Sequence, residues 1–206
     1  MASMHVYILF AHPSRKSFSR EVLEAFTEGL SEAGHTYEVG DLYRMNFRSE
    51  LSQEEYLREI SQEAGSPLPE DVMEEHERIG RADALAFIYP LWWSDCPAKL
   101  KGWFDRVWTY GYAYFYEDGE RGTRIDIEKA VVLCSAGHTE EDLEGTGIAE
   151  SMRSVMLGDR LLGVGVKNVT MEILGGMVPG DDSCREINLM RARRAGRNLE
   201  HHHHHH

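Results

Sequence analysis

Five predicted strands alternate with segments of helical periodicity along the chain, and those at residues 5–11 and 84–89 are uninterrupted apolar runs, rich in branched and aromatic residues. Uninterrupted runs of this kind are typical of strands that are buried on both faces, as in a parallel sheet. Their alternation with helices predicts an α/β fold with a doubly wound, five-stranded sheet. The predicted strands cover residues 5–11, 36–39, 84–89, 129–134 and 167–173.

The first strand, the helix after it and the second strand form a βαβ unit, so these strands should be parallel with a right-handed crossover. With five strands, the order 2-1-3-4-5 fits the pattern best, although the other common doubly wound order is compatible with it. Ligands bind such sheets at the switch point, outside the carboxyl ends of the strands. The loops that begin at His12, Pro90 and Ser135 should therefore form the site.

The length and composition indicate one domain, over residues 4–198 of the 206-residue chain. Residues 1–3 resemble vector sequence, and residues 199–206, Leu-Glu followed by six histidines, resemble an expression tag. Residues 45–80 carry the weakest core signal, so we expect an insertion or a mobile cover there.

A strongly acidic composition limits the classes of partner. The formal net charge of -13 at pH 7 argues against nucleic acid, whose binding depends on cations that neutralise phosphates. No apolar run approaches the ~20 residues of a membrane-spanning helix, so we expect no membrane insertion. The three cysteines are odd in number and lack Cys-x-x-Cys spacing, which suggests buried free thiols in a cytoplasmic protein.

The loop after the first strand carries hydroxyl groups and cations immediately before a predicted helix. His12, Ser17 and Ser19 lie there with Arg15 and Lys16. Because helix N-termini bind anions, a phosphate site is one interpretation. An ordinary capped helix with a solvated loop is the alternative. The spacing matches neither the P-loop nor the GxGxxG fingerprint.

The loop after the third strand begins Pro90-Leu91-Trp92-Trp93-Ser94. It offers backbone amides and a flat aromatic wall, which together suit an isoalloxazine ring. The alternative is that both tryptophans pack in the core or in an interface. Adjacent residues leaving a strand point in different directions, so we expect at most one of them, preferably Trp93, to face a ring.

The loop after the fourth strand is Ser135-Ala136-Gly137-His138. Its small residues allow a close approach of the backbone to a ligand. The acidic residues after His138 lack the spacing of a strong metal motif, so no metal site is predicted.

Several of these motifs resemble, in order over most of residues 5–138, one known enzyme family. This family is the NAD(P)H:quinone reductases of flavodoxin-like fold, of the DT-diaphorase and modulator-of-drug-activity-B type. The matching motifs include Ala11-His12-Pro13, Asp41-Leu42-Tyr43, Pro90-Leu91-Trp92-Trp93, Leu100-Lys101-Gly102-Trp103-Phe104 and Ala113-Tyr114-Phe115-Tyr116.

The resemblance implies a flavin, with FAD favoured over FMN, bound at the interface of a homodimer. It also implies two-electron, ping-pong hydride transfer from NAD(P)H to a quinone, with nitro and azo compounds as further candidate acceptors. Arg185 would be the counterpart of an arginine near the adenosine of FAD. The implied cofactor contacts are His12, Ser17, Phe18, Ser19, Pro90, Leu91, Trp92, Trp93, Ser94, Ser135, Ala136, Gly137 and Arg185.

The implied catalytic residues include Trp93, with Tyr114 and Tyr116 reaching across the dimer to line the acceptor pocket. Mammalian members have a tyrosine and a histidine that assist the reduced ring, but here the matching positions are Leu143 and Ala149. His138 is the candidate to take over that role. Its participation is a hypothesis.

Two other classes of function stay open at this point. Some relatives of this fold are cytoplasmic regulatory subunits of potassium-efflux systems, and a partner surface of that kind leaves no readable motif. A one-electron carrier is the third alternative. The aromatic wall disfavours a carrier, because it suits the stacking of a second ring.

Overall fold

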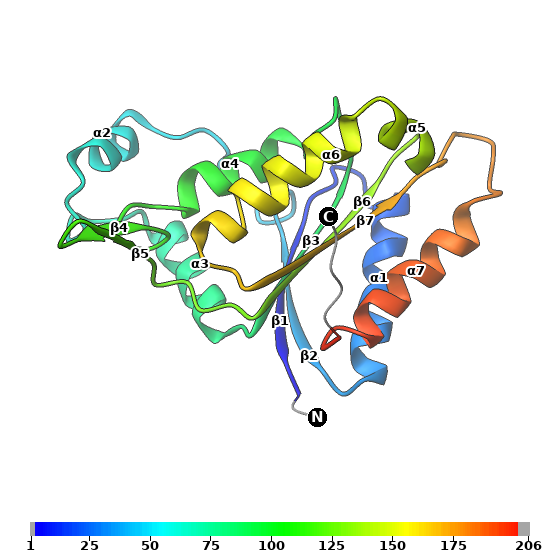
Figure 1. Cartoon of the computed structure of the whole chain (residues 1–206), viewed down its shortest axis with the longest axis horizontal. Coiled ribbons are helices and arrows are strands. Elements are labelled where there is room, and N and C mark those ends of the chain that lie inside the picture. Colours follow the sequence, from blue (N-terminus) through cyan, green and yellow to red (C-terminus); the bar gives the residue numbers. More distant parts are fainter. Residues whose placement is uncertain (1–2, 202–206) are drawn as a thin grey trace.

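The computed structural model describes residues 3–201, and its central element is a five-stranded parallel sheet (Figure 1). The strand order is β2-β1-β3-β6-β7, which confirms the predicted order 2-1-3-4-5 when only the strands of this sheet are counted. Its strands are β1 (His5–Phe10), β2 (Thr36–Asp41), β3 (Ala84–Pro90), β6 (Lys129–Ser135) and β7 (Asn168–Leu174).

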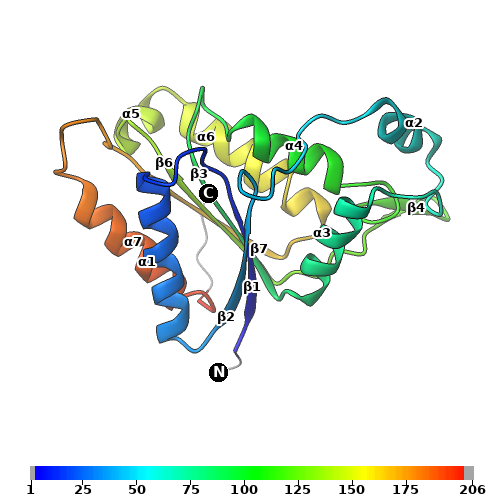
Figure 2. The same ribbon diagram turned by 180° about the vertical axis from the view of Figure 1, so that it is seen from behind.

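Helices cover both faces of the sheet, as a doubly wound fold requires (Figures 1 and 2). Successive side chains of a strand point to opposite faces, and β1 follows this rule. Its Ile8 packs in the cluster that contains α1, whereas Tyr7 and Leu9 pack in the cluster that contains α4. One face carries α1 (Phe18–Glu32) and α7 (Arg185–Arg197), and the other carries α3 (Glu70–Arg81), α4 (Ala98–Val107) and α6 (Ile148–Arg153).

The α1 and α7 helices pack closely because each presents a glycine to the other. A Cβ atom on Gly29 would lie 2.0 Å from the Arg193 carbonyl oxygen, and one on Gly196 would lie 2.2 Å from that of Phe26. The chain after α7 continues this packing, since Leu199 is fully buried in the same cluster. The predicted tag therefore begins within the packed body, and residues 1–2 and 202–206 lie outside the described part.

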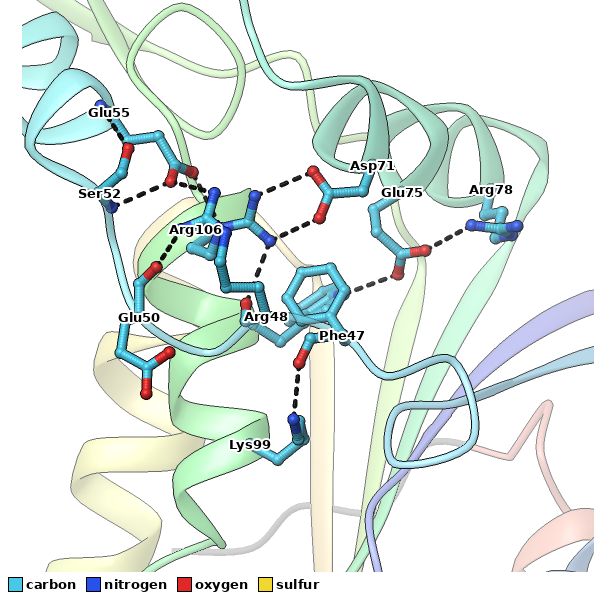
Figure 3. Close-up of polar contacts among 11 residues, drawn as sticks. Phe47, Arg48, Glu50, Ser52, Glu55, Asp71, Glu75, Arg78, Lys99 and Arg106 are labelled. Atoms are coloured by element: carbon cyan, nitrogen blue, oxygen red, sulfur yellow. Dashed lines mark hydrogen bonds and ion pairs between the residues drawn. The ribbon is translucent and has the colours of Figure 1, made fainter.

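The segment between β2 and β3 is anchored to α4 by a buried cation (Figure 3). Arg106 of α4 is 1 % exposed. Its Nε atom donates to Glu55 Oε2 at 2.9 Å, in α2 (Gln53–Ser61). Its Nη1 and Nη2 atoms donate to the Asp71 carboxylate of α3 at 2.7 and 2.9 Å. One guanidinium thus ties both helices of the segment to the body of the protein.

A buried carboxylate completes this attachment. Glu75 of α3 accepts hydrogen bonds from the Tyr7 hydroxyl of β1 at 2.6 Å and from Trp103 Nε1 of α4 at 2.7 Å. Arg78 pairs with its second oxygen at 2.6 Å. These contacts join α3 to the sheet and to α4, so this part of residues 45–80 is packed against the body of the protein.

A short hairpin projects from the end of the molecule at which α2 lies (Figure 1). It consists of β4 (Phe115–Glu117) and β5 (Glu120–Gly122), paired antiparallel. Asp118 and Gly119 connect them with φ values of +54° and +79°. Two positive φ values are characteristic of the type I′ turn, for which Asp-Gly is a favoured sequence.

The chain between β6 and β7 forms several short helical segments. After α6 the chain forms a π-helical segment, η1 (Ser154–Asp159), and then a 3₁₀ turn, η2 (Leu162–Val164). Before α6 lies a short helix, α5 (Glu140–Gly145). No helix within residues 3–201 has both the length and the apolar character to cross a membrane.

The buried ion pairs predict the effect of removing one charge. Arg106→Met should lower the free energy of unfolding by about 3–5 kcal/mol, because Glu55 and Asp71 lose the cation that compensates them. Lys101→Met is the matched control on α4, since its pair with Asp105 is largely exposed and should contribute below about 1 kcal/mol. Urea unfolding monitored by tryptophan fluorescence measures the free energy of unfolding of both variants. Equal losses of stability in the two variants would contradict the anchoring role of Arg106.

Candidate functional site

The loops after β3 and β6 meet at the carboxyl edge of the sheet and enclose a crevice. Its volume is about 700 Å³. The first loop approaches from the other side, where His12 lies edge-on to Trp92 with ring centroids 6.2 Å apart. The three predicted loops are therefore brought together. The residues lining the crevice are Leu91, Trp93, Ser94, Ala136, Gly137, His138, Leu143, Ile148, Val178 and Pro179.

A tight turn shapes the loop after β3. Trp92 N–H donates to the Asp95 carbonyl at 2.8 Å, and Asp95 N–H donates back to that of Trp92 at 3.1 Å. The central residues, Trp93 and Ser94, have φ values of +49° and +67°. The left-handed region costs a non-glycine residue roughly 1–2 kcal/mol. The turn therefore needs support from elsewhere, and it holds the Trp93 side chain fully exposed at its tip.

Arg160 supplies this support from the end of η1. Its Nη1 and Nη2 atoms donate to the two carboxylate oxygens of Asp95 at 2.9 and 3.1 Å. Partial burial alone would raise the pKa of Asp95, but the hydrogen bonds from Arg160 and from the Cys96 amide lower it overall. The Arg160 carbonyl also accepts from Trp108 Nε1 at 2.7 Å. A bidentate pair of this kind fixes orientation as well as distance.

The crevice is bordered by backbone amides that have no internal acceptor. The amides next to them are hydrogen-bonded within the protein. Leu91 N–H donates to the Ser135 carbonyl at 2.7 Å, and Ala136 N–H donates to the Leu174 carbonyl at 3.0 Å. Within residues 3–201, no acceptor is bonded to the amides of Trp93, Ser94, Gly137 or His138. These groups can donate to the polar edge of a planar ligand.

The first loop leads into the start of α1, where two backbone amides have no partner among the described residues. Ser17 caps the helix by accepting from Arg20 N–H at 3.1 Å, while the Phe18 and Ser19 amides bond to no group among the described residues. Burial lowers the pKa of His12. Its Nδ1 accepts from Ser14 N–H at 3.0 Å, so the neutral ring carries its proton on Nε2.

Cations surround this helix terminus. Arg185 of α7 pairs with Glu21, and its guanidinium carbon lies 5.9 Å from the Phe18 ring centroid. Together with the side chains of the first loop it borders an open cavity of about 460 Å³. The lining residues are Arg15, Lys16, Ser17, Phe18, Arg20, Glu21, Glu24 and Arg185. A basic cavity at a helix N-terminus is suited to phosphate groups.

Some predicted site residues lie away from the crevice of this chain. Tyr114 and Tyr116 belong to the hairpin end of the molecule, opposite α5 (Figure 2). Their ring centroids are 6.2 Å apart, and Tyr116 is 54 % exposed. Pro90 is buried as the last residue of β3, and Ser135 contributes its carbonyl to the bond with Leu91. Trp92 packs against His12, so of the two tryptophans only Trp93 lines the crevice.

The structure also reveals residues that the motifs did not indicate. Arg160 and Ile148 follow the loop motifs by many positions, and only their place in the fold brings them to the site. Leu143 lines the crevice, and Ala149 is fully buried in the core. Among residues 3–201, no three histidine, cysteine or acidic side chains form a group that could hold a metal ion.

Comparisons with known proteins agree with this geometry. Residues 4–196 match the Flavodoxin_2 family, described as a flavodoxin-like fold. An uncharacterized NAD(P)H oxidoreductase of Haemophilus influenzae is 33% identical over 184 residues, covering 89% of each chain. Ribosyldihydronicotinamide dehydrogenase [quinone] of Rattus norvegicus is 35% identical over 170 residues, covering 74% of this chain and 72% of that protein.

A solved structure is also very similar. The NAD(P)H:quinone oxidoreductase from Methanothermobacter marburgensis is 98% identical, with a TM-score of 0.95, over 98% of this chain and 100% of that one. An FMN-dependent NADH-azoreductase from Bacillus anthracis, solved with FMN, is 18% identical with a TM-score of 0.70 and shares the fold. Since the family match spans nearly the whole described chain, this protein belongs to the Flavodoxin_2 family of flavodoxin-like proteins.

Proposed function

We propose that the chain is a flavin-dependent NAD(P)H oxidoreductase that reduces quinones by two-electron, ping-pong hydride transfer. The observation that carries this proposal is the crevice at the switch point, bordered by unbonded amides from two loops. The names of the relatives support the same activity, since they include NAD(P)H dehydrogenase [quinone] of Cavia porcellus. Nitro and azo compounds are further candidate acceptors.

The residues present fit a flavin. A bound flavin supplies hydride and two-electron chemistry, while the protein binds, orients and shields the ring. We assign the amides of Trp93, Ser94, Gly137 and His138 to its polar edge, and the exposed Trp93 ring to one side of the stacking site. The crevice volume of about 700 Å³ is within the range of small-molecule sites.

The phosphate end of the cofactor belongs at the start of α1. The amides of Phe18 and Ser19 and the His12 ring are our candidates to hold it. We favour FAD over FMN because the basic cavity beside Arg185 extends beyond these groups and offers space and charge for the second half of a dinucleotide.

We further propose a homodimer in the cytoplasm. The α2 helix exposes Tyr56, Leu57 and Ile60, and Tyr116 is exposed on the nearby hairpin. An apolar surface of this kind favours burial against another protein surface. In a dimer Tyr114 and Tyr116 would line the acceptor pocket of the partner. No feature of the described residues favours a regulatory subunit or an electron carrier over the enzyme.

The purified protein should be yellow, with flavin absorption bands in the visible spectrum, or should become so on addition of FAD. We expect FAD on release and mass spectrometry, and oxidation of NADH or NADPH on addition of a quinone. A colourless protein that binds neither FAD nor FMN would overturn the proposed function.

His138 should assist reduction of the ring from the edge of the crevice. We expect His138→Ala to slow the reductive half-reaction at least tenfold in stopped-flow measurements with NAD(P)H, because a hydrogen-bonding side chain at the site is lost. Glu141→Ala, on the exposed surface of α5, is the control. An unchanged rate in His138→Ala would remove this residue from the mechanism.

The Arg160–Asp95 pair should determine how well the turn binds the ring. Arg160→Met should weaken flavin binding about tenfold, or ~1.4 kcal/mol, because Trp93 and Ser94 can leave the left-handed region. Arg160→Lys should keep only part of the wild-type flavin affinity, since lysine cannot form a bidentate pair. Arg153→Met removes a surface pair with Glu144 and should leave affinity unchanged. Fluorescence titration gives the Kd values, and equal Kd for wild type and Arg160→Met would contradict this role.

A further inference from the structure

A second cavity lies between the Trp92–Asp95 turn and the α6–η1 segment. Its volume is about 130 Å³, and it adjoins the crevice because Leu91, Ser94 and Ile148 line both. The remaining lining residues are Tyr89, Asp95, Ser151, Met152, Val155 and Met156. Two of these side chains come from the π-helical segment, and π-helical turns frequently occur at functional sites.

One of the polar residues that line this cavity is Tyr89. Tyr89 belongs to the central strand β3 and is 2 % exposed, yet its hydroxyl has no hydrogen-bond partner within residues 3–201. Tyr7, buried on the same side of the sheet, donates to Glu75. Because Tyr89 lines the cavity and its hydroxyl bonds to no group among the described residues, this hydroxyl is free to donate to a ligand there.

The walls define the chemistry of that ligand. Ile148, Met152, Val155 and Met156 make the cavity largely apolar, and methionine adapts its shape to what it contacts. Asp95 is already neutralised by Arg160, so no unpaired charge is offered. Burial holds the Tyr89 pKa well above its ordinary value, which keeps the phenol a neutral donor. An uncharged hydrogen-bond acceptor meets these conditions.

The size of the cavity sets a limit as well. An engineered apolar cavity of about 150 Å³ in another protein accepts one benzene ring, and the cavity of about 130 Å³ is similar. We propose that it binds one uncharged ring carrying a carbonyl or ether oxygen, which accepts the Tyr89 hydroxyl. Resting on the proposed function, we assign it as the subsite for a pendant ring of the acceptor, because it adjoins the crevice at Leu91, Ser94 and Ile148.

Binding is tested first without any redox reaction. With ¹³C-methyl methionine labels, acetophenone should shift the Met152 and Met156 signals, and Tyr89→Phe should weaken its binding about tenfold. Ethylbenzene lacks the oxygen and should bind wild type and Tyr89→Phe equally. Val155→Phe should fill the cavity and prevent binding of both probes. Equal acetophenone affinity for wild type and Tyr89→Phe, or no binding, would overturn the proposal.

The assignment to the acceptor is tested on the FAD-loaded protein. For a quinone with a pendant aryl ketone, Tyr89→Phe should raise KM about tenfold with kcat unchanged, whereas unsubstituted benzoquinone should show no change in KM. Displacement of acetophenone by FAD would show that the cavity belongs to the flavin site and would overturn the proposal. Absence of any NAD(P)H turnover would instead refute the proposed function, while the binding result with acetophenone would stand by itself.

Discussion

The ion pair between Arg160 and Asp95 holds the conformation on which the candidate site depends. It connects the end of the π-helical segment to a turn whose two central residues have positive φ values. Without it, Trp93 and Ser94 would relax toward ordinary backbone conformations, and their unbonded amides would leave the crevice. The same turn lines both the crevice and the smaller cavity that Tyr89 borders. A single bidentate contact thus organises two adjoining binding volumes.

A second set of charged contacts attaches the segment between β2 and β3. Arg106 and Glu75 bury charge between the sheet, α4 and the segment that carries α2 and α3 (Figure 3). Buried ion pairs contribute little net stability compared with apolar packing, but they are strongly destabilising to break. This arrangement attaches α2 and α3 to α4, and the hairpin lies at the same end of the molecule as α2, away from α5 (Figure 1). The aromatic hairpin therefore acts on a crevice only if a second copy of the chain presents it there.

Much of the fold was predictable because it depends on local patterns. Apolar runs identify strands buried on both faces, and their alternation with helices leaves few possible strand orders. The sequence Asp118-Gly119 is one that type I′ turns favour. Trp93-Ser94 also has two positive φ values, but it lacks the asparagine, aspartate or glycine residues that usually adopt them. That conformation depends on Arg160, 65 positions from Asp95. Likewise, Arg106 pairs with Asp71, 35 positions away, so the attachment of residues 45–80 to α4 could not be read from their polar composition.

The central claim is that the backbone amides of the β3 and β6 loops bind a flavin at the switch point. Titration of ¹⁵N-labelled protein with FAD, followed by amide NMR, tests it most directly. The account predicts that the Trp93, Ser94, Gly137 and His138 signals shift most, together with those of Phe18 and Ser19. Saturable binding that leaves these six amides unchanged, and shifts signals elsewhere in the chain, would contradict it.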